Sequence, residues 1–299
     1  MNPRLLAVLG ALVLVVGAGG GLAWWLRSEH PAADVSATGV SATGVASPDA
    51  AIAASPDADT GPLPVPPFPP RIADDDQYDR CMTMIANDPE GAEAIATSWQ
   101  ATGGGDGAIH CQALAAIASG EPENGAAMLE SLAHAGKAQG LTLVVLLSQA
   151  AEARLMADQA EPALKDTTEA LAISPDDPDL LIGRANAYDS LERSNEAMDD
   201  LNQALVLDPS RGDALVLRAS LYRRMEKLTE AQADIGRAIA LDPQDAEALL
   251  ERGILRQAMG DLKGARQDWS RAREVDPNSE AAELAAQNLT LLDSGPAKP

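Results

Sequence analysis

The chain has 299 residues, with 45 Asp and Glu against 22 Lys and Arg, so its formal net charge is −23 at pH 7. This acidic balance argues against a nucleic-acid-binding protein, because phosphates are bound by a basic surface. It favours a soluble surface and basic protein partners.

Residues 5–26 form an uncharged apolar stretch, LLAVLGALVLVVGAGGGLAWWL, between Arg4 and Arg27. About 20 apolar residues are enough to cross the hydrocarbon core of a bilayer. The two tryptophans at its end belong to the residue types that gather at membrane interfaces. We therefore expect residues 1–27 to be a short N-terminus followed by a transmembrane signal-anchor helix. A cleaved signal peptide is the alternative, although its apolar core usually has only about 7–15 residues.

The charges beside this stretch set its expected orientation. Arg4 and the terminal amine favour a cytoplasmic N-terminus, whereas Arg27 opposes it and is partly offset by Glu29. The chain is rich in Ala and uses Arg far more than Lys, which is typical of GC-rich bacterial genomes. We expect a single-pass protein of the inner (cytoplasmic) membrane with its C-terminal bulk in the periplasm. The lack of a cysteine near the anchor argues against a lipoprotein.

Residues 28–72 contain VSATG twice and ASPDA twice, and they end in PLPVPPFPPR. Low complexity and a lack of hydrophobic periodicity predict a disordered linker. Its proline tract should be an extended, semi-rigid spacer.

Residues 73–143 are predicted to be a divergent helical region. Four short helices are expected, at 75–88, 89–101, 107–119 and 122–135. The small residues of the last two suggest that about 107–140 is a degenerate copy of the repeat that follows it. The pair before it would be a divergent cap.

Cys81 and Cys111 are the only cysteines of the chain, and both lie in this region. An even number of cysteines in an oxidising compartment predicts one disulfide. Two buried free thiols are the alternative, and a redox-active pair is disfavoured because no CxxC motif is present. His110 and His134 invite a metal-site hypothesis together with the cysteines, but their spacing matches no metal motif. We therefore expect no metal and no cofactor.

Prolines recur at a constant spacing of 34 residues in the second half of the chain. They are Pro175, Pro209, Pro243 and Pro277. A fixed period of this length indicates a stacked array of helical repeats. Each unit has two stretches with apolar residues three and four positions apart, which predicts a pair of helices. The expected units are about 144–177, 178–211, 212–245 and 246–279, followed by a capping helix at 280–293 and a disordered tail at 294–299.

Aliphatic, small, aromatic and proline residues occupy fixed positions in the unit 178–211. They are Leu181, Ala185, Tyr188, Ala197, Leu201, Ala204 and Pro209. The next two units keep this character, except that Arg256 replaces the tyrosine in the last one. The pattern resembles the tetratricopeptide repeat family. The resemblance implies an all-α, right-handed α-solenoid of helix–turn–helix units, here preceded by a transmembrane helix and a disordered linker.

One periodic feature departs from the family pattern, because arginine stands where leucine is usual and aspartate recurs on the second helices. The residues are Asp166, Arg184, Asp200, Arg218, Asp234, Arg252 and Asp268. We expect a ladder of structural ion pairs that sets the helix register. The spacing allows pairing within a unit, as between Arg184 and Asp200, or between units, as between Asp166 and Arg184. An aspartate accompanies each arginine, which argues against an anionic ligand.

The resemblance also places the first helix of each unit on a concave face that binds partners. The residues expected there are Glu152, Leu155, Ile182, Asn186, Asp189, Val216, Ser220, Arg223, Leu250, Ile254 and Gln257. They would form an aliphatic stripe beside a polar one, suited to an extended or helical peptide.

We find no residue set with catalytic spacing in the sequence. The function expected is therefore that of a non-enzymatic, membrane-anchored scaffold for protein or peptide partners. It would act in envelope assembly, translocation or maturation. The alternative is a structural protein whose array self-associates into a homo-oligomer.

Overall fold

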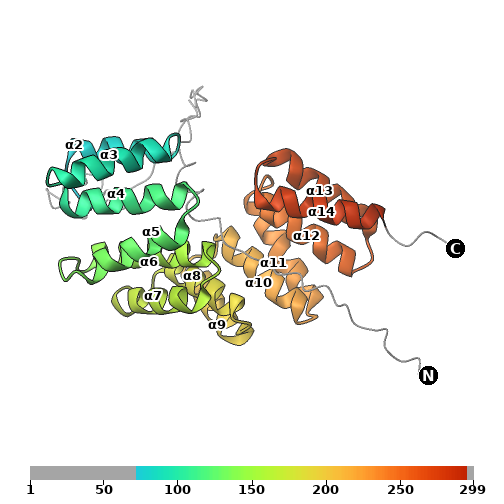
Figure 1. Ribbon diagram of the computed structural model, residues 1–299. Helices are drawn as coiled ribbons and strands as arrows, with labels where there is room; N and C mark the ends of the chain where they lie inside the picture. The colour runs from blue at the N-terminus through green and yellow to red at the C-terminus, as the bar shows by residue number, and fades with distance from the viewer. Residues whose placement is uncertain (1–71, 295–299) are drawn as a thin grey trace, which may run out of the picture.

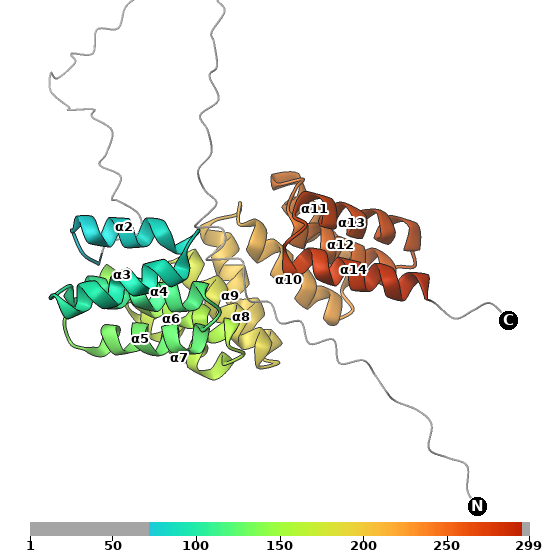
Figure 2. The same cartoon turned by 45° about the horizontal axis from the view of Figure 1, so that its top comes forward.

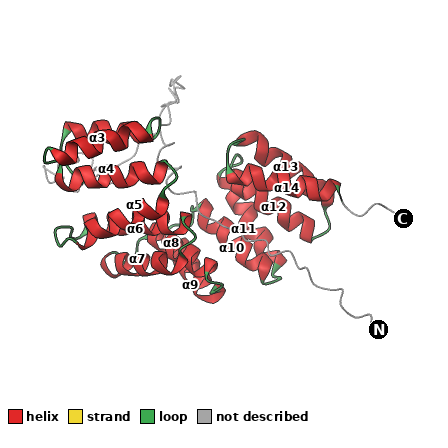
Figure 3. Cartoon of the chain, in the orientation of Figure 1, coloured by secondary structure: helices red, strands yellow, loops and turns green. Residues whose placement is uncertain are grey.

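The computed structural model describes residues 72–294, and in this range the chain forms thirteen α-helices and no strand (Figures 1 and 3). The all-α prediction is confirmed over these residues. The helices are α2 (Asp76–Ile85), α3 (Pro89–Ala101), α4 (Gly105–Ala118), α5 (Pro122–His134), α6 (Leu141–Met156), α7 (Ala160–Ile173), α8 (Pro178–Ser190), α9 (Ser194–Leu207), α10 (Gly212–Arg224), α11 (Leu228–Leu241), α12 (Ala246–Ala258), α13 (Leu262–Val275) and α14 (Glu280–Asp293). Each helix packs against the next, so the chain forms one stack from α2 to α14.

The expected membrane helix at 5–26, nearly all of the expected linker and most of the expected tail lie outside the described residues. Between residues 72 and 294, the longest and most apolar helices still fall short of what crossing a bilayer requires.

The 34-residue period of the sequence is also a period of the backbone. Asp158, Glu192, Glu226 and Gly260 lie just past the ends of α6, α8, α10 and α12, with φ of 58°, 59°, 60° and 85°. A left-handed residue there lets the next backbone amide reach back to the helix, as Arg193 N does to the Tyr188 carbonyl at 2.8 Å. This turn reverses the chain into the second helix of the unit. Only the last unit uses glycine, which adopts this conformation without steric cost.

Small side chains let the two helices of a unit approach closely. The buried alanines at equivalent positions of the second helices are Ala163, Ala197, Ala231 and Ala265. The buried leucines that recur on the first helices are Leu147, Leu181, Leu215 and Leu249. Leu147, Leu181 and Leu215 belong to one large buried cluster, and Leu249 belongs with Ala265 to a second cluster in the last unit. Burial of these clusters is the main stabilising contribution to the stack.

The last unit adapts this core to a larger residue. Trp269 takes the place of Leu201 and Ile235 and is fully buried, and its Nε1 donates to the Leu250 carbonyl at 3.2 Å. The first helix has Gly253 at the facing position, where the two preceding units have alanine. A Cβ at residue 253 would lie 2.3 Å from Trp269 Nε1. Glycine is therefore required there by the tryptophan.

The four helices predicted in the N-terminal region are present as α2 to α5, with boundaries shifted by a few residues. The chain breaks before α3 because Asp88 caps that helix, accepting from Gly91 N at 2.9 Å, and Pro89 starts it. A disulfide joins Cys81 of α2 to Cys111 of α4. Helix α5 packs against α6, so no break in packing separates this region from the repeats.

Candidate partner-binding surface

The first helices of the units lie together on one side of the stack. Helix α6 packs on α8, α12 packs on both α10 and α14, and an ion pair between Asp189 and Arg224 joins α8 to α10. No comparable packing joins consecutive second helices between residues 72 and 294. The second helices must therefore spread apart on the outer, convex side, and the first helices line the inner, concave side. Figure 2 shows the stack from a second direction.

The arginine and aspartate ladder forms within units. Arg184 donates to both carboxylate oxygens of Asp200 at 2.7 Å. Arg218 makes the same two bonds to Asp234, at 2.7 and 2.8 Å. In the last unit, Arg252 binds Asp268 at 2.9 and 2.6 Å. Of the two pairings that the spacing allows, the structure has the one inside each helix pair.

Aromatic residues extend two rungs of this ladder. The Arg193 guanidinium lies 4.5 Å from the ring centre of Tyr188, and Arg184 lies 5.8 Å from the same centre. Tyr222 is placed in the same way beside Arg218 and the ammonium group of Lys227. Arg193 and Lys227 hold the turns of these two units against their helices, so the geometry is that of a structural network.

Asp166 does not belong to the ladder, and this part of the prediction is wrong. The position 34 residues before Arg184 is Ala150, so the unit of Asp166 has no arginine at the ladder position. Asp166 is 1% exposed, and its Oδ2 has no hydrogen-bond partner. Its carboxyl lies beside Glu130, which is held by Arg154 at 2.6 and 2.8 Å. Burial, followed by the charge of Glu130, raises the pKa of Asp166 to about 7.

The aliphatic residues expected on the concave face are mostly covered. Leu155, Ile182 and Leu250 are buried, and so is Ser220. Val216 and Ile254 are half-buried. Close approach of the helices draws these side chains into the core, so they support the concave face from beneath. They do not form the apolar stripe that the sequence predicts.

Two of the predicted polar residues bridge neighbouring first helices. Asp189 of α8 pairs with Arg224 of α10. Arg223 of α10 pairs with the buried Glu251 of α12 at 2.6 Å. Asn186 and Glu152 are half-buried, and Gln257 is exposed. The centre of the concave face is therefore polar and internally cross-linked.

A row of carboxylates links successive units; most of them stand at the starts of α8, α10, α12 and α14, and Glu152 stands in the last part of α6. It was not predicted, although the 34-residue spacing of Asp179, Asp213 and Glu247 could have revealed it. We call this set, with its neighbours, the acidic row: Glu152, Asp179, Asp213, Asp245, Glu247 and Glu280.

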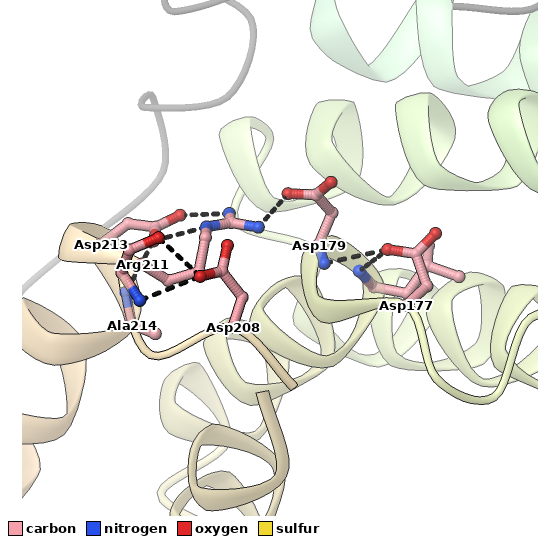
Figure 4. A network of polar contacts seen from close by, with 8 residues as sticks. Asp177, Asp179, Asp208, Arg211, Asp213 and Ala214 are labelled. Carbon is pink, nitrogen blue, oxygen red and sulfur yellow. Dashed lines mark hydrogen bonds and ion pairs between the residues drawn. The ribbon is translucent and has the colours of Figure 1, made fainter. Parts of the chain in front are cut away.

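Arg211 stands within the acidic row at the junction of α8 and α10 (Figure 4). It donates to Asp179 at 2.5 Å and to Asp213 at 3.0 and 2.6 Å. Arg211 occupies the N-cap position of α10, where α8 and α12 have Asp177 and Asp245. The exchange of a capping aspartate for arginine thus binds two units together through their acidic residues.

Two glutamates of the row have a raised pKa, in part because of their acidic neighbours. Burial and the charge of Asp179 raise the pKa of Glu152 to about 7. Glu247 is open to water, yet the surrounding protein and neighbouring carboxylates, above all Asp245, raise its pKa to about 7. The row therefore concentrates negative potential on this side of the stack.

The cysteines and histidines considered as metal ligands in the sequence make other contacts in the structure. Cys81 and Cys111 are joined to each other. His110 is buried between the Tyr78 hydroxyl at 3.0 Å and the Gln149 side-chain oxygen at 2.7 Å, and burial lowers its pKa to about 4. His134 lies near Glu130 O and Glu169. In the region from 72 to 294, no three ligand-type side chains gather as a metal site would require.

A family model for the tetratricopeptide repeat matches residues 178–211 and 212–245. Among solved structures, a thermophilic tetratricopeptide protein of Thermus thermophilus is similar, with 19% identity and a TM-score of 0.54 over 62% of this chain and 100% of that one. The APC/C hetero-tetramer Cut9–Hcn1 is also similar, with 13% identity and a TM-score of 0.57 over 71% of this chain and 42% of that one. These likenesses show the fold. No curated protein sequence matches the chain. The chain therefore contains tetratricopeptide repeats, of which the units 178–211 and 212–245 match the family model directly.

Proposed function

We propose that the chain is a non-enzymatic scaffold that holds a basic segment of a partner protein on the concave face of its array. The tetratricopeptide fold commonly mediates protein–protein interaction and peptide binding. The acidic row is the observation that carries the proposal, because it brings several carboxylates of successive units close together, with Arg211 as their main counter-charge. A segment rich in Lys or Arg would complement this negative potential. The attraction would also raise the rate at which the two proteins associate.

The proposal includes a membrane anchor and a periplasmic location. The apolar stretch 5–26 supports the anchor, and the disulfide between Cys81 and Cys111 supports an oxidising compartment. An anchored array would raise the effective concentration of its partner at the membrane surface within the reach of the linker.

Charge reversal on the concave face tests the proposal. The full chain and the variant Asp213→Lys/Glu247→Lys would be used to recover partners from the membranes of the producing cell. A matched control, Asp199→Lys/Glu230→Lys, changes the same number of charges at exposed positions of the second helices α9 and α11. The proposal expects the first variant to lose the partner and the control to keep it. Equal recovery by all three proteins would refute the basic-segment proposal.

A reporter fused to the C-terminus tests the location. A reporter that works only in an oxidising compartment should be active, and one that works only in the cytoplasm should be silent. The opposite result would place the array in the cytoplasm and remove the argument from the disulfide.

A second candidate function is self-association. Helix α14 is the last helix of the stack between residues 72 and 294, and its Leu291 is 67% exposed. A second copy could cover such an apolar side chain. Light scattering of the full chain in detergent separates the two candidates, since a strict monomer at all concentrations removes self-association.

A further inference from the structure

A small cavity of about 160 Å³ lies between the second helix of one unit, α11, and the first helix of the next, α12. Its polar lining comes from Gln232, Arg252 and Arg256, and its apolar lining includes Ile235 and Leu255. Gly236 opens it, because a Cβ at that residue would meet no atom within 4 Å. The residues that line this cavity belong neither to the acidic row nor to the set expected on the concave face.

Two arginines of the cavity share one aspartate. Arg252 uses its Nε and Nη2 for Asp268, and Arg256 adds its Nη1 to Asp268 Oδ2 at 2.7 Å. The Nη1 of Arg252 and the Nη2 of Arg256 have no hydrogen-bond acceptor in the part of the chain that the structure describes. The two side chains are 26% and 35% exposed, so a ligand from solution can reach them.

The preceding junction shows what the free nitrogen of such an arginine binds. There, Arg218 stands in the place of Arg252, and its Nη1 donates to the side-chain oxygen of Asn202 at 2.8 Å. Asn202 occupies the position that is Gly236 one unit later. The exchange of asparagine for glycine removes an acceptor oxygen and leaves an open space beside the same donor.

A second exchange adds positive charge at the same place. Arg256 stands where the preceding unit has Tyr222. Two guanidinium groups face one buried carboxylate, Asp268, which leaves one positive charge in excess. Asp261 offsets little of it, because its carboxylate is 4.0 Å from Arg256 Nε and 56% exposed. The cavity therefore combines space, unpaired donors and a single surplus charge.

We infer that the cavity between α11 and α12 is a binding site for a carboxylate, held by Arg252 Nη1 and Arg256 Nη2. A monoanion balances the surplus charge, and its two oxygens match two separate N–H donors. The ligand is either a small carboxylic acid or a carboxylate of a peptide. This site lies apart from the concave face, so it stands whether or not that face binds a basic partner.

Titration of the full chain with sodium acetate, at constant ionic strength against sodium chloride, tests the site. The side-chain Nε–H signals of Arg252 and Arg256 would be followed by nuclear magnetic resonance, with N-acetyl-glycylglycine and inorganic phosphate as further probes. We expect saturable shifts with acetate. Binding of the dipeptide as well would assign the site to peptide carboxylates, and binding of acetate alone would assign it to small acids.

Two variants built from the chain's own repeats provide the controls. Gly236→Asn supplies the acceptor of the preceding unit and should weaken acetate binding about tenfold or more, the scale of one lost charge-assisted hydrogen bond. Arg256→Tyr restores the tyrosine of the preceding units and should also weaken it. Unfolding midpoints near that of the parent chain would show that both remain folded. No saturable shift with acetate, preference for phosphate, or undiminished binding by Gly236→Asn would overturn the inference.

Discussion

Arg218 and Asp234 face each other across the two helices of one unit and are joined by two parallel hydrogen bonds of 2.7 and 2.8 Å. The aspartate is almost fully buried, and the arginine is shielded by Tyr222 on one side. The same pair recurs one unit before and one unit after. A charged pair thus joins these two helices, and each partner depends on the other.

Loss of one partner should destabilise the array strongly. Arg218→Ala leaves Asp234 buried with only Arg237 nearby, at 3.8 Å, so the free energy of unfolding should fall by about 3–5 kcal/mol. Urea unfolding followed by circular dichroism measures this. The double variant Arg218→Met/Asp234→Leu should recover most of the loss, because no charge is then left unpaired. A double variant as unstable as the single one would show that packing, rather than the pair, holds these helices.

Asp166 should make stability fall as pH rises. Its pKa increases from an ordinary value of 3.8 to about 7 on folding, chiefly because of burial. Between these pH values the folded chain keeps a proton that the unfolded chain has lost, so stability decreases through this window and levels off above it. Asp166→Asn should flatten part of this decrease. Glu152 and Glu247 act in the same direction, so the measurement is the difference between parent and variant in urea unfolding from pH 4 to pH 8. If the unfolding free energies of parent and variant changed in parallel with pH, the raised pKa of Asp166 would be contradicted.

The disulfide should contribute measurably to the N-terminal helices. Cys81 and Cys111 are 30 residues apart, and closing a loop of this size stabilises by about 3–4 kcal/mol through the entropy of the unfolded chain. The variant Cys81→Ala/Cys111→Ala should lose about this much, and a reductant should lower the unfolding midpoint of the parent chain. The variant itself should not respond to the reductant. A parent chain equally indifferent to reductant would mean that the bond is absent or adds nothing.

Gly253 and Trp269 should behave as a coupled pair. Gly253→Ala forces a methyl group against the indole ring and should cost about 1–3 kcal/mol, the usual range for overpacking. Trp269→Leu alone should also destabilise, because it leaves a void. The double variant recreates the Ala and Leu combination of the unit 178–211, so it should be more stable than the sum of the single losses predicts. Additive losses would argue that the two residues adapt independently.

The period of the sequence predicted the ladder because it fixes which residues share a position in successive units. The same comparison, taken one unit earlier, would have shown Ala150 in place of the arginine and left Asp166 without a partner. It would also have revealed the acidic row. These features depend only on register, which the proline spacing sets.

The repeat register could not predict how deeply each side chain is buried within the helix stack. Ile182 and Leu250 occupy positions that the family resemblance places on the concave face, yet the neighbouring helices close over them. How far they close depends on side chains of several units at once. The bridges from Arg224 to Asp189 and from Arg223 to Glu251 likewise join residues about one unit apart, and nothing in a single unit indicates them.

Site-specific photo-crosslinking in the producing cell tests the central claim, that a partner occupies the concave face, most directly. A photo-reactive residue would be placed at Asn186 or Gln257 on the first helices, and at Val206, which is 80% exposed on the second helix α9, as the control. The claim predicts that Asn186 and Gln257 capture the same partner, that Asp213→Lys/Glu247→Lys abolishes both crosslinks, and that Val206 captures none of it. Capture of that partner only from Val206 would contradict the claim and place the interaction on the convex side.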